Sequence, residues 1–134
     1  MAEYYLGVDP GRSKTGLAVT DQAGKIFYLK VVATGDLKKE LGECTQRFLP
    51  RAAIVGNGTN SSAVADMVQQ VLPELPMSII EEAHSTEDAR KLYWEENPPQ
   101  GWKKIVPLGL LVPVEPLDAY AAAVLVRRFL HMCK

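Results

Sequence analysis

Residues 5–19, Tyr-Leu-Gly-Val-Asp-Pro-Gly-Arg-Ser-Lys-Thr-Gly-Leu-Ala-Val, contain an apolar run, an Asp-Pro-Gly turn and a second apolar run. Tyr4-Tyr5-Leu6 predicts a buried strand that carries Asp9 to its end, and Pro10-Gly11 predicts the turn that follows. Gly16 opens the return strand of a hairpin. A carboxylate at the end of a buried strand is costly to desolvate without a cationic partner, so Asp9 is the first candidate functional residue. Asp-Pro-Gly is also ordinary turn chemistry, and this stretch alone leaves both interpretations open.

The composition is that of an ordinary globular domain. The 134 residues are 47% hydrophobic and 23% charged, with a formal net charge of −1, which fits a single domain over residues 1–134 with one core. No apolar run is long enough to cross a bilayer and no signal pattern opens the chain, so we expect a cytoplasmic protein without membrane contact. Cys44 and Cys133 have no metal-binding or disulfide spacing. The near-neutral charge gives no global attraction to nucleic acid.

The rest of the chain predicts alternating helices and strands. A third strand over 26–32 completes an antiparallel meander. Because helical crossovers join the later strands, these should be parallel, and we predict an α/β fold with a mixed five-stranded sheet and helices on both faces. The other predicted elements are a helix from Thr34 to Pro50, a strand over 51–56, a helix capped by Asn60, Ser61 or Ser62, a strand over 77–80, a helix from Ser85 to before Asn97, an ordered loop over 98–116 and a last helix opened by Glu115-Pro116.

Three acidic residues occupy comparable places in this predicted fold. Asp9 ends the first strand, Glu82 follows the fifth, and Asp118 begins the last helix, whose small residues should let it lie close to the sheet. The carboxyl ends of parallel strands collect at one edge, so we expect the acids to meet there. A hard divalent cation such as Mg²⁺ would relieve their repulsion, and two ions about 3.5–4 Å apart can promote phosphodiester hydrolysis. Surface charge or helix capping is the competing explanation for Asp118 and for Glu81.

Three motifs resemble those of one known family. Leu6-Gly7-Val8-Asp9-Pro10-Gly11, with Lys14, Gly16 and Ala18-Val19 after it, resembles the opening of YqgF/RuvX-type proteins, RNase H-like nucleases related to the RuvC Holliday junction resolvases. Glu82-Ala83-His84-Ser85-Thr86 resembles the family's Glu-Arg-Leu-Thr-Thr, and Asp118-Ala119-Tyr120-Ala121-Ala122 resembles its final Asp-x-x-Ala-Ala. The resemblance spans nearly the whole chain. It implies an RNase H-like fold, phosphodiester cleavage that depends on Mg²⁺ or Mn²⁺, and Asp9, Glu82 and Asp118 as the catalytic, metal-binding residues.

The sequence departs from the family pattern in two places. The family's Asp-Glu-Arg is Glu81-Glu82-Ala83 here, without the basic residue, and its Gly-Leu-Pro-rich loop is Gly56-Asn57-Gly58-Thr59-Asn60. These changes keep a second interpretation open, a non-catalytic nucleic-acid-binding or scaffold module with the same fold. Asp9-x-Gly11 with Gly16 also resembles the first phosphate loop of sugar kinases and actin, but those proteins need two such domains.

The expected partner is nucleic acid, either Holliday junction DNA or a structured ribosomal RNA precursor. Symmetric cleavage of a junction would also call for a two-fold homodimer. For Lys14 the competing interpretation is a solvated turn lysine, and Asn57 and Thr59 have the alternative of only shaping their loop. The predicted substrate-binding residues are Lys14, Asn57, Thr59, Thr86 and Arg90.

Overall fold

The computed structural model describes residues 3–58, 60–82, 85–98 and 117–132. Thr59, most of the loop predicted over 98–116 and the predicted helix opening at Glu115-Pro116 lie outside these residues. In order along the chain, the elements are β1 (Tyr4–Asp9), β2 (Lys14–Asp21), β3 (Ile26–Ala33), the 3₁₀ helix η1 (Thr34–Asp36), α1 (Leu37–Phe48), β4 (Ala53–Gly56), α2 (Ser61–Val71), β5 (Met77–Ile80), α3 (Ser85–Glu96) and α4 (Asp118–Met132).

The five strands form one mixed sheet in the order β3-β2-β1-β4-β5. The β1–β2 and β2–β3 pairs are antiparallel, whereas the β1–β4 and β4–β5 pairs are parallel. This arrangement confirms the predicted meander followed by parallel strands. Because β1, β4 and β5 run in the same direction, their carboxyl ends, at Asp9, Gly56 and Ile80, lie at the same edge of the sheet.

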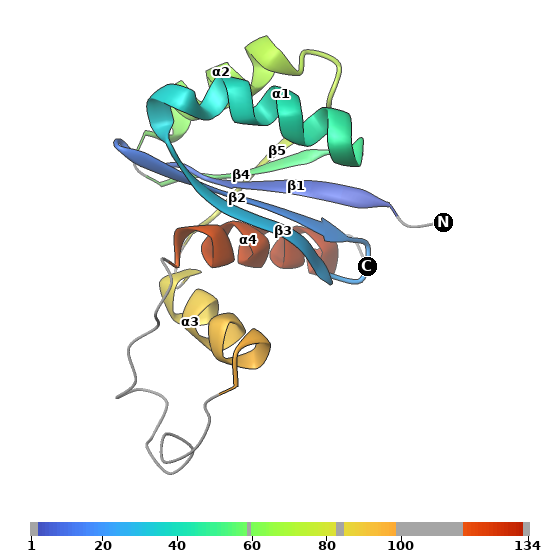
Figure 1. Cartoon of the computed structure of the whole chain (residues 1–134), viewed down its shortest axis with the longest axis vertical. Coiled ribbons are helices and arrows are strands. Elements are labelled where there is room, and N and C mark those ends of the chain that lie inside the picture. Colours follow the sequence, from blue (N-terminus) through green and yellow to red (C-terminus); the bar gives the residue numbers. More distant parts are fainter. Residues whose placement is uncertain (1–2, 59, 83–84, 99–116, 133–134) are drawn as a thin grey trace.

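Helices cover both faces of the sheet, as predicted. Helices α1 and α2 lie on one face and α4 on the other, with α3 packed on the outer side of α4 (Figure 1). The strands alternate accordingly: Leu6 and Val8 of β1 belong to the core under α1 and α2, whereas Tyr5 packs toward α4. Over the described residues, no helix combines the length and the apolar character needed to span a bilayer.

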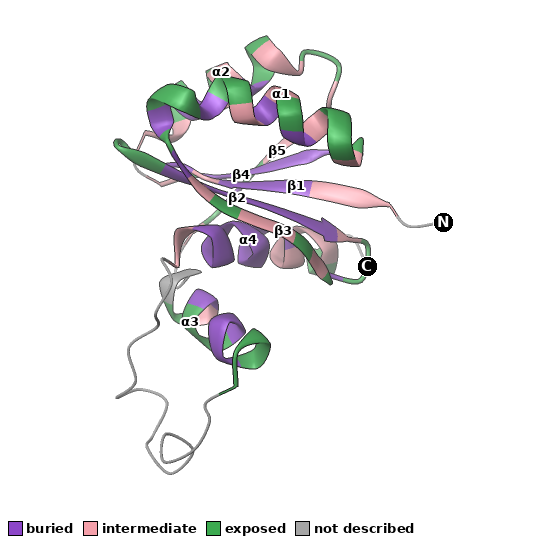
Figure 2. Ribbon diagram, viewed as in Figure 1, coloured by how far each residue is buried: buried purple, intermediate pink, exposed green. Residues whose placement is uncertain are grey.

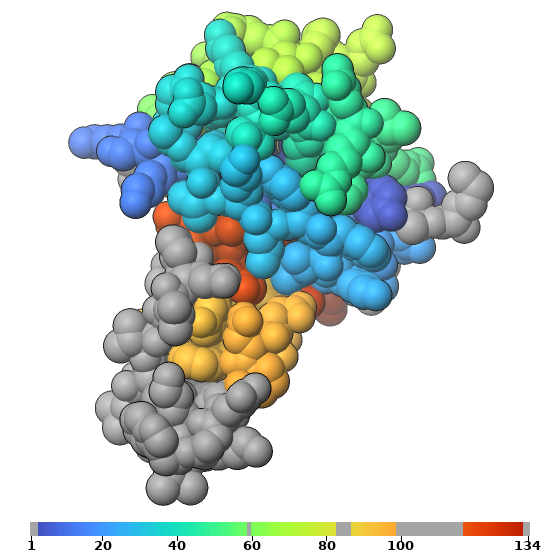
Figure 3. Space-filling model, viewed as in Figure 1, coloured from blue at the N-terminus to red at the C-terminus, as the bar shows by residue number. Residues whose placement is uncertain are grey.

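Helix α4 is the central element of the second layer. It is buried from Ala119 to Val126 (Figure 2), because the sheet contacts one side of it and α3 the other. In the space-filling view it is visible only in a narrow band between the strands and α3 (Figure 3). Such burial on all sides explains why its inner turns carry alanine and valine rather than an alternation of polar and apolar residues.

Two glycines let α4 approach the sheet closely. A Cβ atom built on Gly7 would overlap the carbonyl oxygen of Ala122, and one on Gly16 would overlap the carbonyl oxygen of Asp118. These two carbonyls lie about one helical turn apart. Gly16 is also the β2 partner of Asp9 in the β1–β2 ladder. The contact therefore places the first residue of α4, Asp118, at the strand edge where β1 ends.

Candidate acidic site

The turn that follows Asp9 is fixed by two side chains from distant elements. The carbonyl oxygen of Gly11 accepts hydrogen bonds from Thr34 Oγ1 at 2.9 Å and from Asn60 Nδ2 at 3.2 Å. Asn60 precedes α2 with a left-handed backbone (φ 66°), and its side chain makes no capping hydrogen bond. Of the three residues predicted to cap this helix, Asn60 holds the N-cap position, but its side chain connects the start of α2 to the Asp9 turn instead of making a capping hydrogen bond.

Glu82 reaches across the end of β4. A Cβ atom built on Gly56 would overlap Oε1 of Glu82, and one on Gly58 would overlap Oε2. We call this glycine pair, Gly56 and Gly58, the glycine cradle, since the carboxylate occupies the space that side chains there would fill. Oε1 is fully buried and accepts no hydrogen bond from an N–H or hydroxyl group of the described residues. A buried, unpartnered carboxylate oxygen is costly and indicates a partner that the protein itself does not supply.

Asp9, Glu82 and Asp118 are electrostatic neighbours. Burial, which is the largest cause, a hydrogen bond to Glu82 and the negative charges of Glu82 and Asp118 together raise the pKa of Asp9 from 3.8 to about 8. At neutral pH the Asp9 carboxyl therefore keeps a proton that it donates to Glu82. The structure thus brings together the three acids that the sequence places far apart, at the edge where the strands end.

The acidic pair fits a divalent cation by its chemistry. A cation would take the place of the proton on Asp9, and the unpartnered oxygen of Glu82 could serve as one of its ligands. Proteins usually hold Mg²⁺ through one or two carboxylates, with water and substrate phosphate as the other ligands. Across the described ranges, no three Asp, Glu, His or Cys side chains are arranged so that they could hold one ion together. The role of Asp118 as a third ligand therefore stays a prediction.

The two adjacent glutamates differ in where they point. Glu82 faces Asp9, whereas Glu81 is exposed and lines a groove between α3, α4 and β5. The backbone carbonyl of Glu81 accepts a hydrogen bond from Arg128. Of the pair, Glu82 is the residue that belongs to the acidic site.

Four of the five predicted substrate-binding residues lie in the described chain, on β2, on α3 and in the loop after β4, and Thr59 lies outside it. Lys14 is the exposed first residue of β2, Arg90 is exposed on α3, and Thr86 lies in the first turn of α3. Asn57 is also exposed, and its Oδ1 accepts a hydrogen bond from the backbone N–H of Glu82 at 3.0 Å. The substrate contacts of these residues and of Thr59 stay predictions.

Sequence reasoning missed two features of the site. The glycine cradle has a visible signal, the spacing Gly56-x-Gly58 directly after a buried strand. The contact of Arg128 with the Glu81 carbonyl has none, because it joins the fourth turn of a helix to a residue 47 positions earlier.

Comparisons with known proteins add the last observation. No family model matches the sequence, and neither does any curated protein. Among solved structures, the chain is similar to Thermus thermophilus RuvC in complex with a Holliday junction substrate, with a TM-score of 0.61 and 16% identity over 98% of this chain and 95% of that chain. A second Thermus thermophilus RuvC structure gives a TM-score of 0.60 and 18% identity over 97% and 96% of the two chains. The protein thus has the RuvC-like, RNase H-like α/β fold that its motifs predict, over almost its whole length.

Proposed function

We propose that this protein is a divalent-metal-dependent endonuclease that hydrolyses phosphodiester bonds in branched DNA. The observation that carries the proposal is the acidic pair: Asp9 is hydrogen-bonded to Glu82 at the carboxyl edge of the sheet, Oε1 of Glu82 is buried without a partner among the described residues, and the charge of Asp118 acts on Asp9. Acids that repel one another in a partly buried site are a common sign of a functional site.

Each acid has a definite part in this proposal. Asp9 and Glu82 would bind the cation between them, and Asp118 would add negative charge that strengthens its binding. A bound Mg²⁺ or Mn²⁺ ion supplies an activated water and stabilises the leaving oxygen of a phosphodiester. The glycine cradle would contribute by leaving room for the Glu82 carboxylate, since a Cβ atom at Gly56 or Gly58 would overlap it.

Branched DNA is the substrate class that the comparisons favour. The similar RuvC structure contains a Holliday junction substrate, and the shared fold covers nearly the whole of both chains. The exposed cations Lys14 and Arg90 would contact backbone phosphates, which supply most of the affinity in nucleic-acid binding. Symmetric cleavage of a junction would also require a two-fold homodimer, which sedimentation of the protein with and without junction DNA would detect.

The test compares cleavage of two substrates by matched variants. The protein and Asp9→Asn are incubated with Mg²⁺ or Mn²⁺ and either a four-way DNA junction or a structured ribosomal RNA fragment. Asp36→Asn is the control, because Asp36 is exposed and makes no capping hydrogen bond. We expect cleavage of the junction that Asp9→Asn abolishes and Asp36→Asn leaves unchanged. Cleavage of the RNA but not of the junction would contradict the DNA substrate and identify structured RNA as the substrate class.

The second candidate is a non-catalytic nucleic-acid-binding or scaffold module. The observation in its favour is that no three side chains of the described residues form a ready metal site. Junction binding with no cleavage in Mg²⁺ or Mn²⁺ would support this candidate and contradict the nuclease proposal.

A further inference from the structure

The peptide group between Glu81 and Glu82 is held from both sides by side chains. Its carbonyl oxygen accepts a hydrogen bond from Arg128 Nη1 at 2.8 Å, and its N–H donates to Asn57 Oδ1 at 3.0 Å. The two holding residues come from different elements, Asn57 from the β4–α2 loop and Arg128 from α4. Both polar groups of one peptide plane are thus fixed by the tertiary structure, although the peptide lies in a loop.

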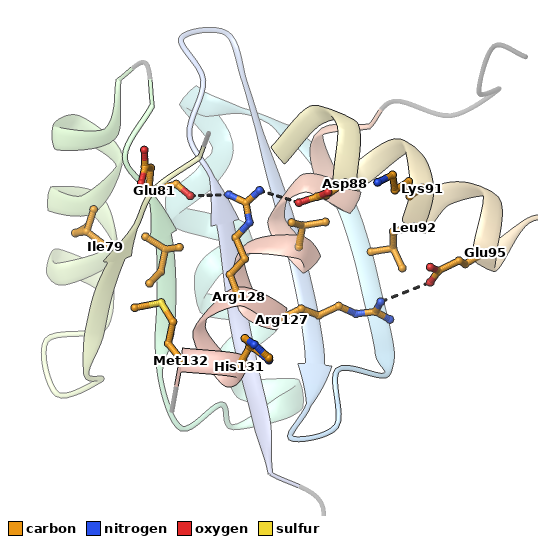
Figure 4. Close-up of a pocket in the computed structure, with 12 residues that line it drawn as sticks. Ile79, Glu81, Asp88, Lys91, Leu92, Glu95, Arg127, Arg128, His131 and Met132 are labelled. Atoms are coloured by element: carbon orange, nitrogen blue, oxygen red, sulfur yellow. Dashed lines mark hydrogen bonds and ion pairs between the residues drawn. The ribbon is translucent and has the colours of Figure 1, made fainter. Parts of the chain in front are cut away.

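The two holding residues are themselves anchored. The backbone N–H of Asn57 donates to the carbonyl of Ile80 at 3.0 Å, which extends the β4–β5 pairing by one step. Arg128 uses Nη2 to contact Asp88 at 2.8 Å, at the beginning of α3. Figure 4 shows its guanidinium lying between the Glu81 carbonyl and Asp88, inside the groove between β5, α3 and α4. One planar group therefore connects the chain just before Glu82 with the helix after it.

The orientation of this peptide decides where the Glu82 side chain goes. Rotating the peptide plane would turn the Cα–Cβ bond of Glu82 and move the carboxylate off the glycine cradle. We propose that Asn57 and Arg128 are positioning residues, together the Glu82 clamp, that keep the Glu82 carboxylate beside Asp9 in the geometry that binds a divalent cation. This inference rests on the proposed function. It gives Asn57 a role through Glu82, in place of the substrate contact predicted from the sequence.

The energetics favour an effect on the site rather than on the fold. Asn57 is exposed, so its hydrogen bond is not part of the core. The ion pair of Arg128 with Asp88 is partly exposed, at 25% and 43% of the two side chains, and such pairs contribute little to stability. Residues that orient metal ligands, by contrast, change metal affinity by about 10–100-fold when they are removed.

The test measures Mn²⁺ binding by electron paramagnetic resonance titration of the folded protein, without substrate. The variants are Asn57→Ala, Arg128→Ala and Arg128→Lys, and the matched control is Arg127→Ala. Arg127 is the neighbouring residue of α4, and its guanidinium contacts the Gly24 carbonyl and Glu95 instead. We expect Asn57→Ala and Arg128→Ala to raise the dissociation constant for Mn²⁺ by about tenfold or more. Arg127→Ala should leave it within about twofold.

Arg128→Lys separates geometry from charge. Lysine keeps the positive charge but lacks the planar fork that reaches two acceptors at once. We therefore expect Arg128→Lys to bind Mn²⁺ nearly as weakly as Arg128→Ala. Amide hydrogen exchange gives a readout that needs no metal: the Glu82 amide should exchange faster in Asn57→Ala than in the unmodified protein and in Arg127→Ala, because its acceptor is lost.

These measurements can overturn the Glu82 clamp without overturning the proposed nuclease function. If the protein binds Mn²⁺ and Asp9→Asn does not, the acidic site stands. Unchanged Mn²⁺ affinity in Asn57→Ala and both Arg128 variants would then overturn the clamp alone. An equal loss of affinity in Arg127→Ala would also overturn it, since the effect would come from the charge of α4. A protein that binds no Mn²⁺ at all would contradict the proposed function and the clamp with it.

Discussion

Two pairs of glycines perform different tasks in this molecule. Gly7 and Gly16 leave room for the backbone of α4, whereas Gly56 and Gly58 leave room for the carboxylate of Glu82. The first contact joins two rigid elements. The second contact, between the glycine cradle and Glu82, involves the end of one flexible side chain, which can move aside. A methyl group added at the first pair should therefore damage the fold, and one added at the second pair should damage only the site.

This difference separates what builds the sheet–helix core from what builds the acidic site. Both pairs lie close to one of the three acids, since Gly16 contacts the backbone of Asp118 and the glycine cradle contacts Glu82. Substitutions a few ångströms from the site should nevertheless fall into two classes, one visible in unfolding and the other visible in metal binding.

The largest expected effect is that of Gly16→Ala on stability. The added methyl group would overlap the Asp118 carbonyl and the following backbone nitrogen of α4, so the helix must move away from β2. Overpacking of this kind typically costs about 1–3 kcal/mol and occasionally more, and we expect a loss of about 3 kcal/mol because backbone atoms are involved. Urea denaturation measures it. A change below about 1 kcal/mol would show that α4 does not lie this close to the sheet.

The next effect is that of Gly56→Ala on metal binding. Its methyl group would displace the Glu82 carboxylate from the cradle, and no backbone atom is among the three nearest neighbours. We expect the free energy of unfolding to change by less than about 1 kcal/mol, while Mn²⁺ affinity falls by about 10–100-fold. Titration calorimetry and urea denaturation of the same sample measure both. Loss of stability without loss of affinity would reverse the assignment of the two glycine pairs.

In the absence of metal, Asp9→Asn is expected to increase the stability of the folded protein, whereas Gly16→Ala decreases it. Burial first, and then the neighbouring acids, raise the pKa of Asp9 from 3.8 to about 8. The folded protein thus holds a proton that the unfolded chain releases between about pH 4 and pH 8, and stability falls as the pH rises through this range. Asparagine does not titrate, so Asp9→Asn should be more stable at pH 8 by about 1–3 kcal/mol. Equal stabilities at pH 8 in the presence of a chelator would contradict this expectation.

The smallest expected effect is that of Gly42→Ala, which serves as a control for the other variants because its added methyl group contacts nothing. Gly42 lies in the middle of α1, and a Cβ atom built on it meets nothing within 4 Å. Gly42→Ala should stabilise the protein by about 0.5–1 kcal/mol, because alanine loses less backbone freedom in a helix than glycine does. Thermal unfolding should show a small rise in Tm and no change in Mn²⁺ affinity. If Gly42→Ala is less stable than the unmodified protein, then the stability changes of the glycine variants cannot be explained by the contacts of the added methyl group.

Much of the fold was predictable because it depends on local patterns. Alternation of apolar residues places Leu6 and Val8 on one face of β1, and the Asp-Pro-Gly turn ends that strand at Asp9. The small residues of α4 predicted a helix close to the sheet, which the structure confirms through Gly7 and Gly16. The parallel direction of β1, β4 and β5 then brings the strand ends to one edge.

The site was predictable only in part. The proximity of Asp9 and Glu82 follows from the sheet edge, but the fit of Glu82 over the glycine cradle requires the side-chain geometry of two loops. Asn60 is one of three residues predicted to cap α2; it holds the N-cap position, but its side chain donates to the Gly11 carbonyl instead of the helix. The sequence shows that an asparagine before a helix can make a capping hydrogen bond. Whether its side chain makes that bond depends on neighbouring acceptors, here the Gly11 carbonyl, which the local sequence does not reveal.

The proposal that Glu82 and Asp9 form a cation site is tested by a comparison of the two adjacent glutamates. Glu81→Gln and Glu82→Gln remove the same charge one residue apart, the first at an exposed side chain and the second at the cradle. Mn²⁺ titration followed by electron paramagnetic resonance should give an unchanged dissociation constant for Glu81→Gln and one raised by about 100-fold or more for Glu82→Gln. Equal losses in the two variants, or a loss in Glu81→Gln alone, would contradict a cation site at Glu82.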